Sequence, residues 1–213
     1  MKSIALIGAG LAAAVAAGAN AAVTGLQVEY GGLVGGRHVW SVYAVSNDVN
    51  HVMLNIIGHT VTAGSMSGVE HNDFGGGTWN PGLTILPDQL GNDSYVTVTG
   101  LAGAAAGTNL DPSFGSGLGA TIPTGAGWLT SNPGSPILFT GGRIKIMQVA
   151  GTTYSNGPGG AFYTGRLTVG YKANANSTTP LYAENLSYTI GVPAPGALAL
   201  LGLAGLAGRR RRA

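Results

Sequence analysis

The chain has 213 residues, of which 45% are hydrophobic and 8% are charged, and it contains no cysteine. This composition excludes a disulfide-stapled miniprotein and a highly charged disordered chain, and the length allows one sizeable hydrophobic core. The net charge of +2 comes from the termini, because Lys2 and Arg209–Arg212 supply five of the ten basic residues. Residues 22–189 carry five basic and eight acidic residues (5 − 8 = −3), so we expect no nucleic-acid partner despite the pI of about 9.0.

The first segment, residues 1–21, has the pattern of a secretory signal peptide. Lys2 provides a positive start, residues 4–17 form an uncharged apolar run, and Ala19-Asn20-Ala21 is a small-x-small cleavage site. A membrane-spanning or buried first helix is the alternative, but the apolar run is short for a bilayer. We therefore expect export by the Sec machinery and cleavage by signal peptidase, which leaves Ala22 as the first residue.

Residues 22–189 are expected to form one β-rich extracytoplasmic domain. Short β-branched and aromatic runs alternate with turn residues, and long helical periodicity is absent. Period-two alternation, as in Val96 and Val98 against Thr97 and Thr99, predicts strands with one wet face and hence antiparallel sheets. The expected fold class is all-β, an antiparallel β-sandwich that is jelly-roll-like, with a barrel as the alternative. The expected strands cover residues 25–30, 38–45, 52–57, 60–63, 83–86, 94–99, 137–140, 143–149, 162–171 and 186–190.

The stretch from Gly100 to Pro136 interrupts this pattern. It is rich in Gly, Ala and Pro, and Phe114 and Trp128 stand among few strand-forming residues. A long structureless loop is uncommon in a compact domain. We expect either an ordered surface loop pinned by Trp128 or a flexible insertion.

Residues that could bind a metal are few. Familiar catalytic motifs are absent, and the spacing of the four histidines fits no zinc pattern. Glu70, Asp73 and Asp93 supply the hard oxygen ligands that Ca²⁺ prefers, although Asp is also a common turn residue. No catalytic residue and no cofactor are expected, and calcium at these three residues is the candidate exception.

Two tryptophans are candidates for stacking on sugar rings. Trp79 lies in a Gly-rich loop sequence and is expected to be exposed, and Trp128 lies in the long Gly-rich stretch. The alternative is that both rings are buried, which is the commoner outcome in β cores. A pair of carboxylates could also serve a glycosidase, but the sequence does not show which acidic residues converge.

The final segment, residues 190–213, is predicted to be a sorting tail. Residues 190–208 carry no charge, and a helix of this length would span about 28 Å, close to one hydrocarbon thickness. Four arginines follow at once, Arg209, Arg210, Arg211 and Arg212, which favours a transmembrane helix with the arginines in the cytoplasm and the body outside.

The motif Pro193-Ala194-Pro195, the Leu-, Ala- and Gly-rich run and the Arg cluster together resemble a PEP-CTERM sorting signal. The resemblance implies recognition by an exosortase, a membrane protease-transpeptidase, and an association with extracellular polysaccharide production. Ala194 departs from the family's usual Pro-Glu-Pro and so bears on cleavage. The resemblance covers about the last 22 residues and indicates a destination rather than an activity.

The sequence therefore predicts a non-enzymatic exported protein of the cell envelope or outer surface. It would be an exosortase substrate, held in the membrane by its C-terminal helix and released to the extracellular matrix if the tail is processed. Its expected role is structural or interactive and linked to extracellular polysaccharide. The alternatives are a carbohydrate-binding module and a secreted polysaccharide hydrolase.

Overall fold

The computed structural model describes residues 22–71, 78–80, 91–101, 107–115, 121–132, 134–151 and 161–191. Regular structure in these residues is all β, apart from two short 3₁₀ turns at Pro112–Phe114 and Thr140–Gly142. All strand pairs are antiparallel. The all-β, antiparallel prediction is confirmed, and the arrangement is consistent with a β-sandwich.

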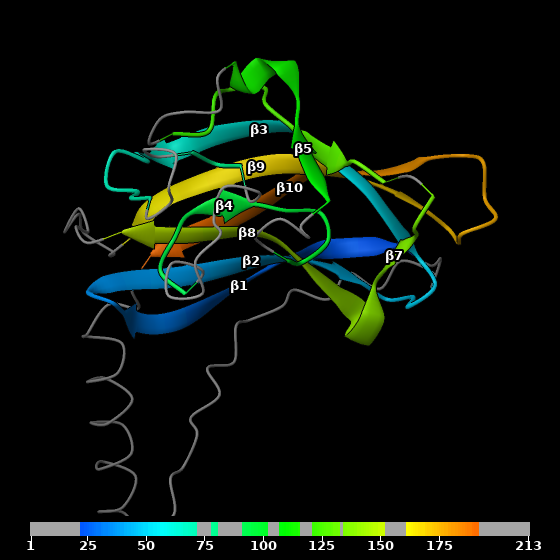
Figure 1. Ribbon diagram of the computed structural model, residues 1–213, viewed down its shortest axis with the longest axis horizontal. Helices are drawn as coiled ribbons and strands as arrows, with labels where there is room; N and C mark the ends of the chain where they lie inside the picture. The colour runs from blue at the N-terminus through cyan, green and yellow to red at the C-terminus, as the bar shows by residue number, and fades with distance from the viewer. Residues whose placement is uncertain are drawn as a thin grey trace, which may run out of the picture.

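The strands form two sheets, which Figure 1 shows one above the other. Sheet A has the order β1 (Val23–Val34), β2 (Arg37–Ser46), β8 (Arg143–Gly151) and β4 (Tyr95–Val96). Sheet B has the order β10 (Leu181–Gly191), β9 (Ala161–Lys172), β3 (Val52–Gly64), β6 (Trp128–Thr130) and β5 (Thr108–Leu110), and β7 (Ile137–Leu138) also pairs with β3.

A two-glycine turn sets the register of the β1–β2 hairpin. Val34 pairs with Arg37, and the intervening Gly35 and Gly36 have φ of 55° and 81°. Positive φ at both central residues is the requirement of a type I′ turn, whose twist matches that of paired strands. Glycine meets this requirement without a steric penalty, so the hairpin closes over the shortest possible connection.

The core lies between the two sheets. In β2 alternate residues from Trp40 to Ser46 are buried and those between them are partly exposed, whereas in β8 all residues from Ile146 to Gly151 are buried. Burial of each such aliphatic side chain contributes about 1.5–3 kcal/mol. The inward residues include Trp40, Val42 and Ala44 of β2, Met147 and Val149 of β8, Ile56 of β3, Leu167 and Val169 of β9, and Tyr188 and Ile190 of β10.

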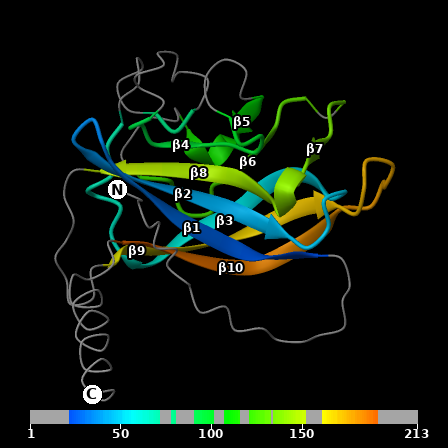
Figure 2. The same cartoon turned by 90° about the horizontal axis from the view of Figure 1, so that it is seen from below.

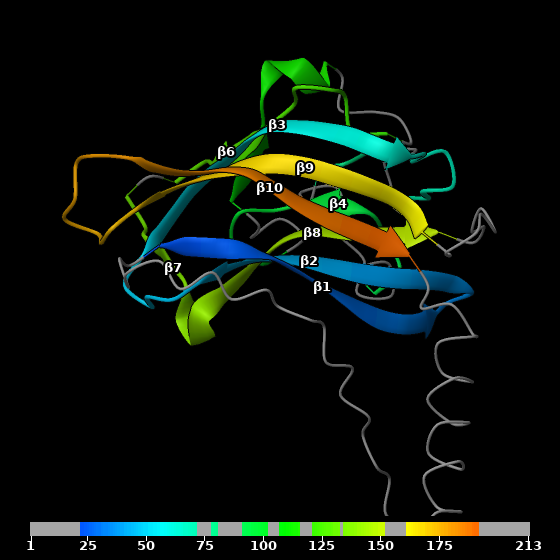
Figure 3. The ribbon, with the colours of Figure 1, turned by 180° about the vertical axis from the view of Figure 1, so that it is seen from behind.

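The sheets approach each other along one side of the molecule, where β1 lies against β10. Figures 2 and 3 show these two strands on the side opposite β4, β5 and β6. Trp40 Nε1 of β2 donates a hydrogen bond of 3.2 Å to the carbonyl oxygen of Gly191 at the end of β10. The last residue of sheet B is therefore bonded directly to sheet A.

A bulge in β3 places a histidine in the core. Ile57 is exposed, Gly58 has φ of 68°, and His59 is fully buried. The pairing of β3 with β9 shifts register between Ile57 and Thr60. A glycine with positive φ is the usual device for such a bulge, which here turns the following side chain inward.

Most of the predicted strands are present, with different limits. The predicted strands 52–57 and 60–63 form one strand, β3, and the predicted strand 186–190 is the second half of β10. The stretch from Gly100 to Pro136 contains two strands that were not predicted, β5 and β6. Within the described part of this stretch, Trp128 is fully buried and bonded to Thr97. The predicted strand 83–86 lies outside the described residues.

The described residues leave out all of the first segment, 1–21, and residues 192–213 of the tail. Ile190 and Gly191 were assigned to the tail, but both belong to β10, and Ile190 is fully buried. The limit of the tail is therefore wrong by two residues. Within the described ranges, no helix has the length and hydropathy needed to span a bilayer.

Candidate functional site

Both tryptophans proposed as sugar platforms are buried, with 0% of their surface exposed. Trp79 packs edge-on against the ring of His71, with centroids 4.9 Å apart, and its backbone oxygen accepts a hydrogen bond from Val96. Trp128 Nε1 donates to the carbonyl oxygen of Thr97 at 3.0 Å. The expectation that Trp79 is exposed is wrong, because Trp79 is bonded to Val96 of β4 in sheet A and packs against His71. Neither ring can stack on a ligand in this conformation.

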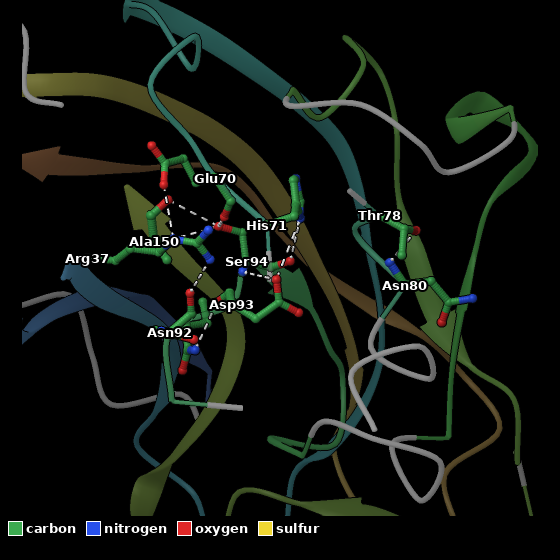
Figure 4. A network of polar contacts seen from close by, with 10 residues as sticks. Arg37, Glu70, His71, Thr78, Asn80, Asn92, Asp93, Ser94 and Ala150 are labelled. Atoms are coloured by element: carbon green, nitrogen blue, oxygen red, sulfur yellow. Dashed lines mark hydrogen bonds and ion pairs between the residues drawn. The ribbon is translucent and has the colours of Figure 1, made fainter. Parts of the chain in front are cut away.

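Glu70 and Asp93, two of the three proposed calcium ligands, belong to one polar network (Figure 4). The Glu70 carboxylate accepts a hydrogen bond of 3.0 Å from Arg37 Nε and so forms an ion pair. The Asp93 carboxylate is fully buried, and its Oδ1 accepts a hydrogen bond of 2.8 Å from the backbone N–H of Ser94.

This network does not assemble a metal site in the part of the chain that the structure describes. No group of three or more acidic, histidine or cysteine side chains converges there. The Glu70 oxygen that a cation would need already binds a guanidinium group. Asp73, the third proposed ligand, lies outside the described residues, so the calcium prediction stays a prediction.

Ser94, His71 and Asp93 are the residue types of a hydrolytic triad, but their geometry differs from one. Ser94 Oγ donates to the Glu70 carbonyl oxygen at 2.6 Å and accepts from the Ala150 N–H at 2.9 Å. The His71 Nδ1 atom lies 2.9 Å from the Ser94 carbonyl oxygen and 3.9 Å from Asp93 Oδ1. A nucleophile must be bonded to its base, whereas this hydroxyl is committed to backbone groups. The network therefore ties the segments around residues 70 and 94 to β8.

The opposite side of the molecule presents a different surface, the outer face of sheet B. Five residues, one from each of the strands β10, β9, β3, β6 and β5, pair in a continuous row across the sheet. We call this the Tyr182 row: Tyr182 of β10, Gly170 of β9, Asn55 of β3, Leu129 of β6 and Asn109 of β5. Their inward neighbours Val169, Ile56 and Trp128 are buried, so the row faces outward.

The Tyr182 row combines an exposed ring with an unsatisfied polar atom. The side chain of Tyr182 is 50% exposed, and Leu129 is 40% exposed. Asn55 Oδ1 is buried and accepts no hydrogen bond from any residue that the structure describes. An unpaired buried amide oxygen costs about 1–3 kcal/mol, which makes it an unusual feature at a surface row.

A small pocket lies beside this row, where β3 bulges at Leu54. Its volume is about 210 Å³, and its lining includes Leu54, Thr130, Ser135 and Lys172. It therefore combines an aliphatic wall with two hydroxyl groups and one ammonium group. The sequence indicated part of this outer face, since Arg166, Thr168 and Gly170 alternate with Leu167, Val169 and Tyr171. Tyr182 was missed because it precedes the predicted strand 186–190.

The sequence matches no protein-family model, no curated protein and no solved structure.

Proposed function

We propose that this chain is an exported, non-enzymatic protein of the cell envelope or extracellular matrix, and that it acts by binding through its β body. The outer face of sheet B carries this proposal. That face offers an exposed tyrosine and a pocket, whereas the Glu70 and Asp93 carboxylates and the Ser94 hydroxyl of the Figure 4 network are bonded internally. Exposed aromatic and polar groups on a rigid sheet are suited to recognition.

The two ends of the folded body are compatible with processing on both sides. The Ala22 backbone N donates to Asn47 Oδ1 at 2.7 Å. Cleavage after Ala21 would convert this N–H into an ammonium group, which makes a stronger bond to the same oxygen. At the other end, β10 stops at Gly191, two residues before Pro193.

The proposal includes a route to the surface: Sec export, signal peptidase, retention by a helix within the tail, and an exosortase that acts at Pro193-Ala194-Pro195. The apolar, Ala- and Gly-rich segment is a weak membrane span, so the four arginines should decide whether it stops in the bilayer. The jelly-roll-like form predicted for the sandwich stays a prediction.

The route is tested by replacing Arg209, Arg210, Arg211 and Arg212 with Ser, and in a control with Lys. Each arginine costs about 2.5 kcal/mol or more to place at a bilayer centre, so the Ser variant should pass through and appear unprocessed in the medium. The Lys variant keeps the charge and should be retained. Fractionation and mass spectrometry of the mature termini provide the measurement. Retention and processing of the Ser variant as in the wild type would refute the sorting-tail mechanism.

A further inference from the structure

The charged residues of the body are distributed unequally between the two sheets. Arg166 and Lys172 both lie on β9 and form no ion pair or hydrogen bond in the described part of the chain. The other basic residues of the body lie on sheet A and are engaged, in the contacts Arg37–Glu70, Arg143–Glu29 and Lys145–Gln148. The available positive charge of the body is therefore confined to one strand of sheet B.

Both β9 cations point to the outer face. Arg166 and Lys172 share the parity of Gly170, while Leu167, Val169 and Tyr171 between them are buried. Six residues of β-strand separate the two cations by about 20 Å. Tyr182 pairs with Gly170, so its exposed ring lies between the two charges along the strand direction.

Gly170 makes room at this point for the side chains of Asn55 and Tyr182, which cover it. A Cβ atom built at residue 170 would lie 2.0 Å from Asn55 Oδ1 and 3.2 Å from Tyr182 Cε1. Asn55 and Tyr182 therefore approach the same bare backbone from the two neighbouring strands. Asn55 Oδ1 is buried in this contact, so the ring of Tyr182 is the exposed group at this point of the row.

We propose that the outer face of sheet B binds an anionic polysaccharide that lies along β9. The Tyr182 ring stacks on a sugar face, and Lys172 and Arg166 pair with acidic groups on separate sugar units. The pocket beside Lys172 receives one of these units. Glu184, the acidic residue of β10, forms no ion pair with either cation. This inference rests on the proposed binding role but not on the sorting tail.

The spacing and number of the charges favour a sugar polymer over other polyanions. Nucleic-acid sites neutralise several phosphates spaced closely along the backbone, and membrane-surface sites gather clusters of four or more basic residues. Two cations about 20 Å apart provide neither. Between them lie one aromatic ring and hydroxyl or amide side chains, which are the groups that recognise sugar rings.

The test uses the full chain with Arg209, Arg210, Arg211 and Arg212 replaced by Ser, purified in detergent, so that the tail adds no cluster of cations, and measures affinity for polygalacturonate by calorimetry. Fully methyl-esterified polygalacturonate has the same backbone without charge and is the matched ligand. The variants are Arg166→Gln with Lys172→Gln, Tyr182→Ala, and Tyr182→Phe as the conservative exchange. Arg143→Gln removes one cation from sheet A as a control.

We expect the double Gln variant to bind about tenfold more weakly, and Tyr182→Ala about threefold to tenfold more weakly. Tyr182→Phe and Arg143→Gln should bind as the wild type does, and the esterified polymer should bind more weakly than the acid. Equal binding of the acid and the ester, or an unchanged affinity of the double variant, would overturn the proposal. Equally tight binding of single-stranded DNA or of anionic phospholipid vesicles would overturn the choice of a sugar polymer.

A second measurement needs no variant. The body contains two lysines, Lys172 on the proposed surface and Lys145 on sheet A. Polygalacturonate should slow the acetylation of Lys172 and leave that of Lys145 unchanged, as read by mass spectrometry. Equal rates at Lys172 with and without the polymer would refute the site. This measurement on purified protein does not depend on export in cells. The export route and the polysaccharide site can therefore be refuted independently of each other.

Discussion

His59 is a titratable side chain inside the core of sheet B. Its Nε2 atom lies 2.7 Å from the Tyr188 hydroxyl, and its Nδ1 atom has no hydrogen-bond partner among the described residues. Burial lowers the pKa of His59 from 6.5 to about 4. The ring is therefore neutral in the folded protein at pH 7, where desolvation of a charged imidazolium would be costly.

This pKa predicts a loss of stability in acid. The unfolded chain binds a proton near pH 6.5 and the folded chain only near pH 4, so the free energy of unfolding falls as pH falls through this interval. The difference between the two pKa values of His59 corresponds to a loss of about 3 kcal/mol in the free energy of unfolding. Chemical denaturation at pH 8 and pH 4 should show a smaller pH dependence in His59→Gln, whose amide can still bond to Tyr188. Identical pH dependence in the variant and the wild type would contradict the assignment.

At the scale of single elements, β6 shows how three residues can anchor a long Gly-rich stretch. Its residues alternate between Trp128, which is fully buried, and Leu129, which is 40% exposed. Trp128 packs against Phe114, with centroids 6.4 Å apart, and its indole N–H bonds to Thr97. One side chain thus joins β6, the Phe114 turn and the segment after β4.

Truncation of these two neighbours should have very different effects. We expect Trp128→Ala to lower the free energy of unfolding by about 3–5 kcal/mol, because it removes a large core side chain and leaves a buried carbonyl unpaired. Leu129→Ala on the outer face should change it by about 0.5 kcal/mol or less. Urea denaturation of both variants measures this. Similar losses would mean that β6 does not bury Trp128 in solution.

At the scale of the whole molecule, the two sheets share one core. A single cluster of buried side chains takes residues from both, and the Trp40–Gly191 hydrogen bond joins sheet A to the last strand of sheet B. Neither sheet can bury its inner face without the other, since the inward residues of each sheet pack against those of its partner.

The body should therefore unfold in one cooperative transition. Tryptophan fluorescence reports on the shared core, which contains Trp40, Trp79 and Trp128. The thermal unfolding curve measured by fluorescence should therefore coincide with the curve measured by far-UV circular dichroism. Trp40→Phe should shift both curves to lower temperature together, because it removes the bond to Gly191. Two separated transitions would show that the sheets fold as independent units.

Local chemistry explains what could be predicted and what could not. The strand class followed from period-two patterns such as Arg166 to Tyr171, which depend only on nearest neighbours along the chain. The strands β5 and β6 were missed because their three-residue pairings are stabilised by contacts with Thr97 and Ile56, which lie far away in the sequence. Trp79 was misjudged for the same reason: a Gly-rich loop does not reveal which surface it folds onto.

The sequence by itself determined that the body is all-β and antiparallel, because alternation of polar and apolar side chains is a property of each strand alone. Only the tertiary structure decided which charged residues form ion pairs within the protein and which remain exposed for binding a partner. It paired Arg37 and Arg143 with acids more than 30 residues away and left Arg166 and Lys172 on an open face. It also brought Tyr182, Gly170 and Asn55 into one row, because strand order sets lateral neighbours and the order β10–β9–β3 departs from the order along the chain.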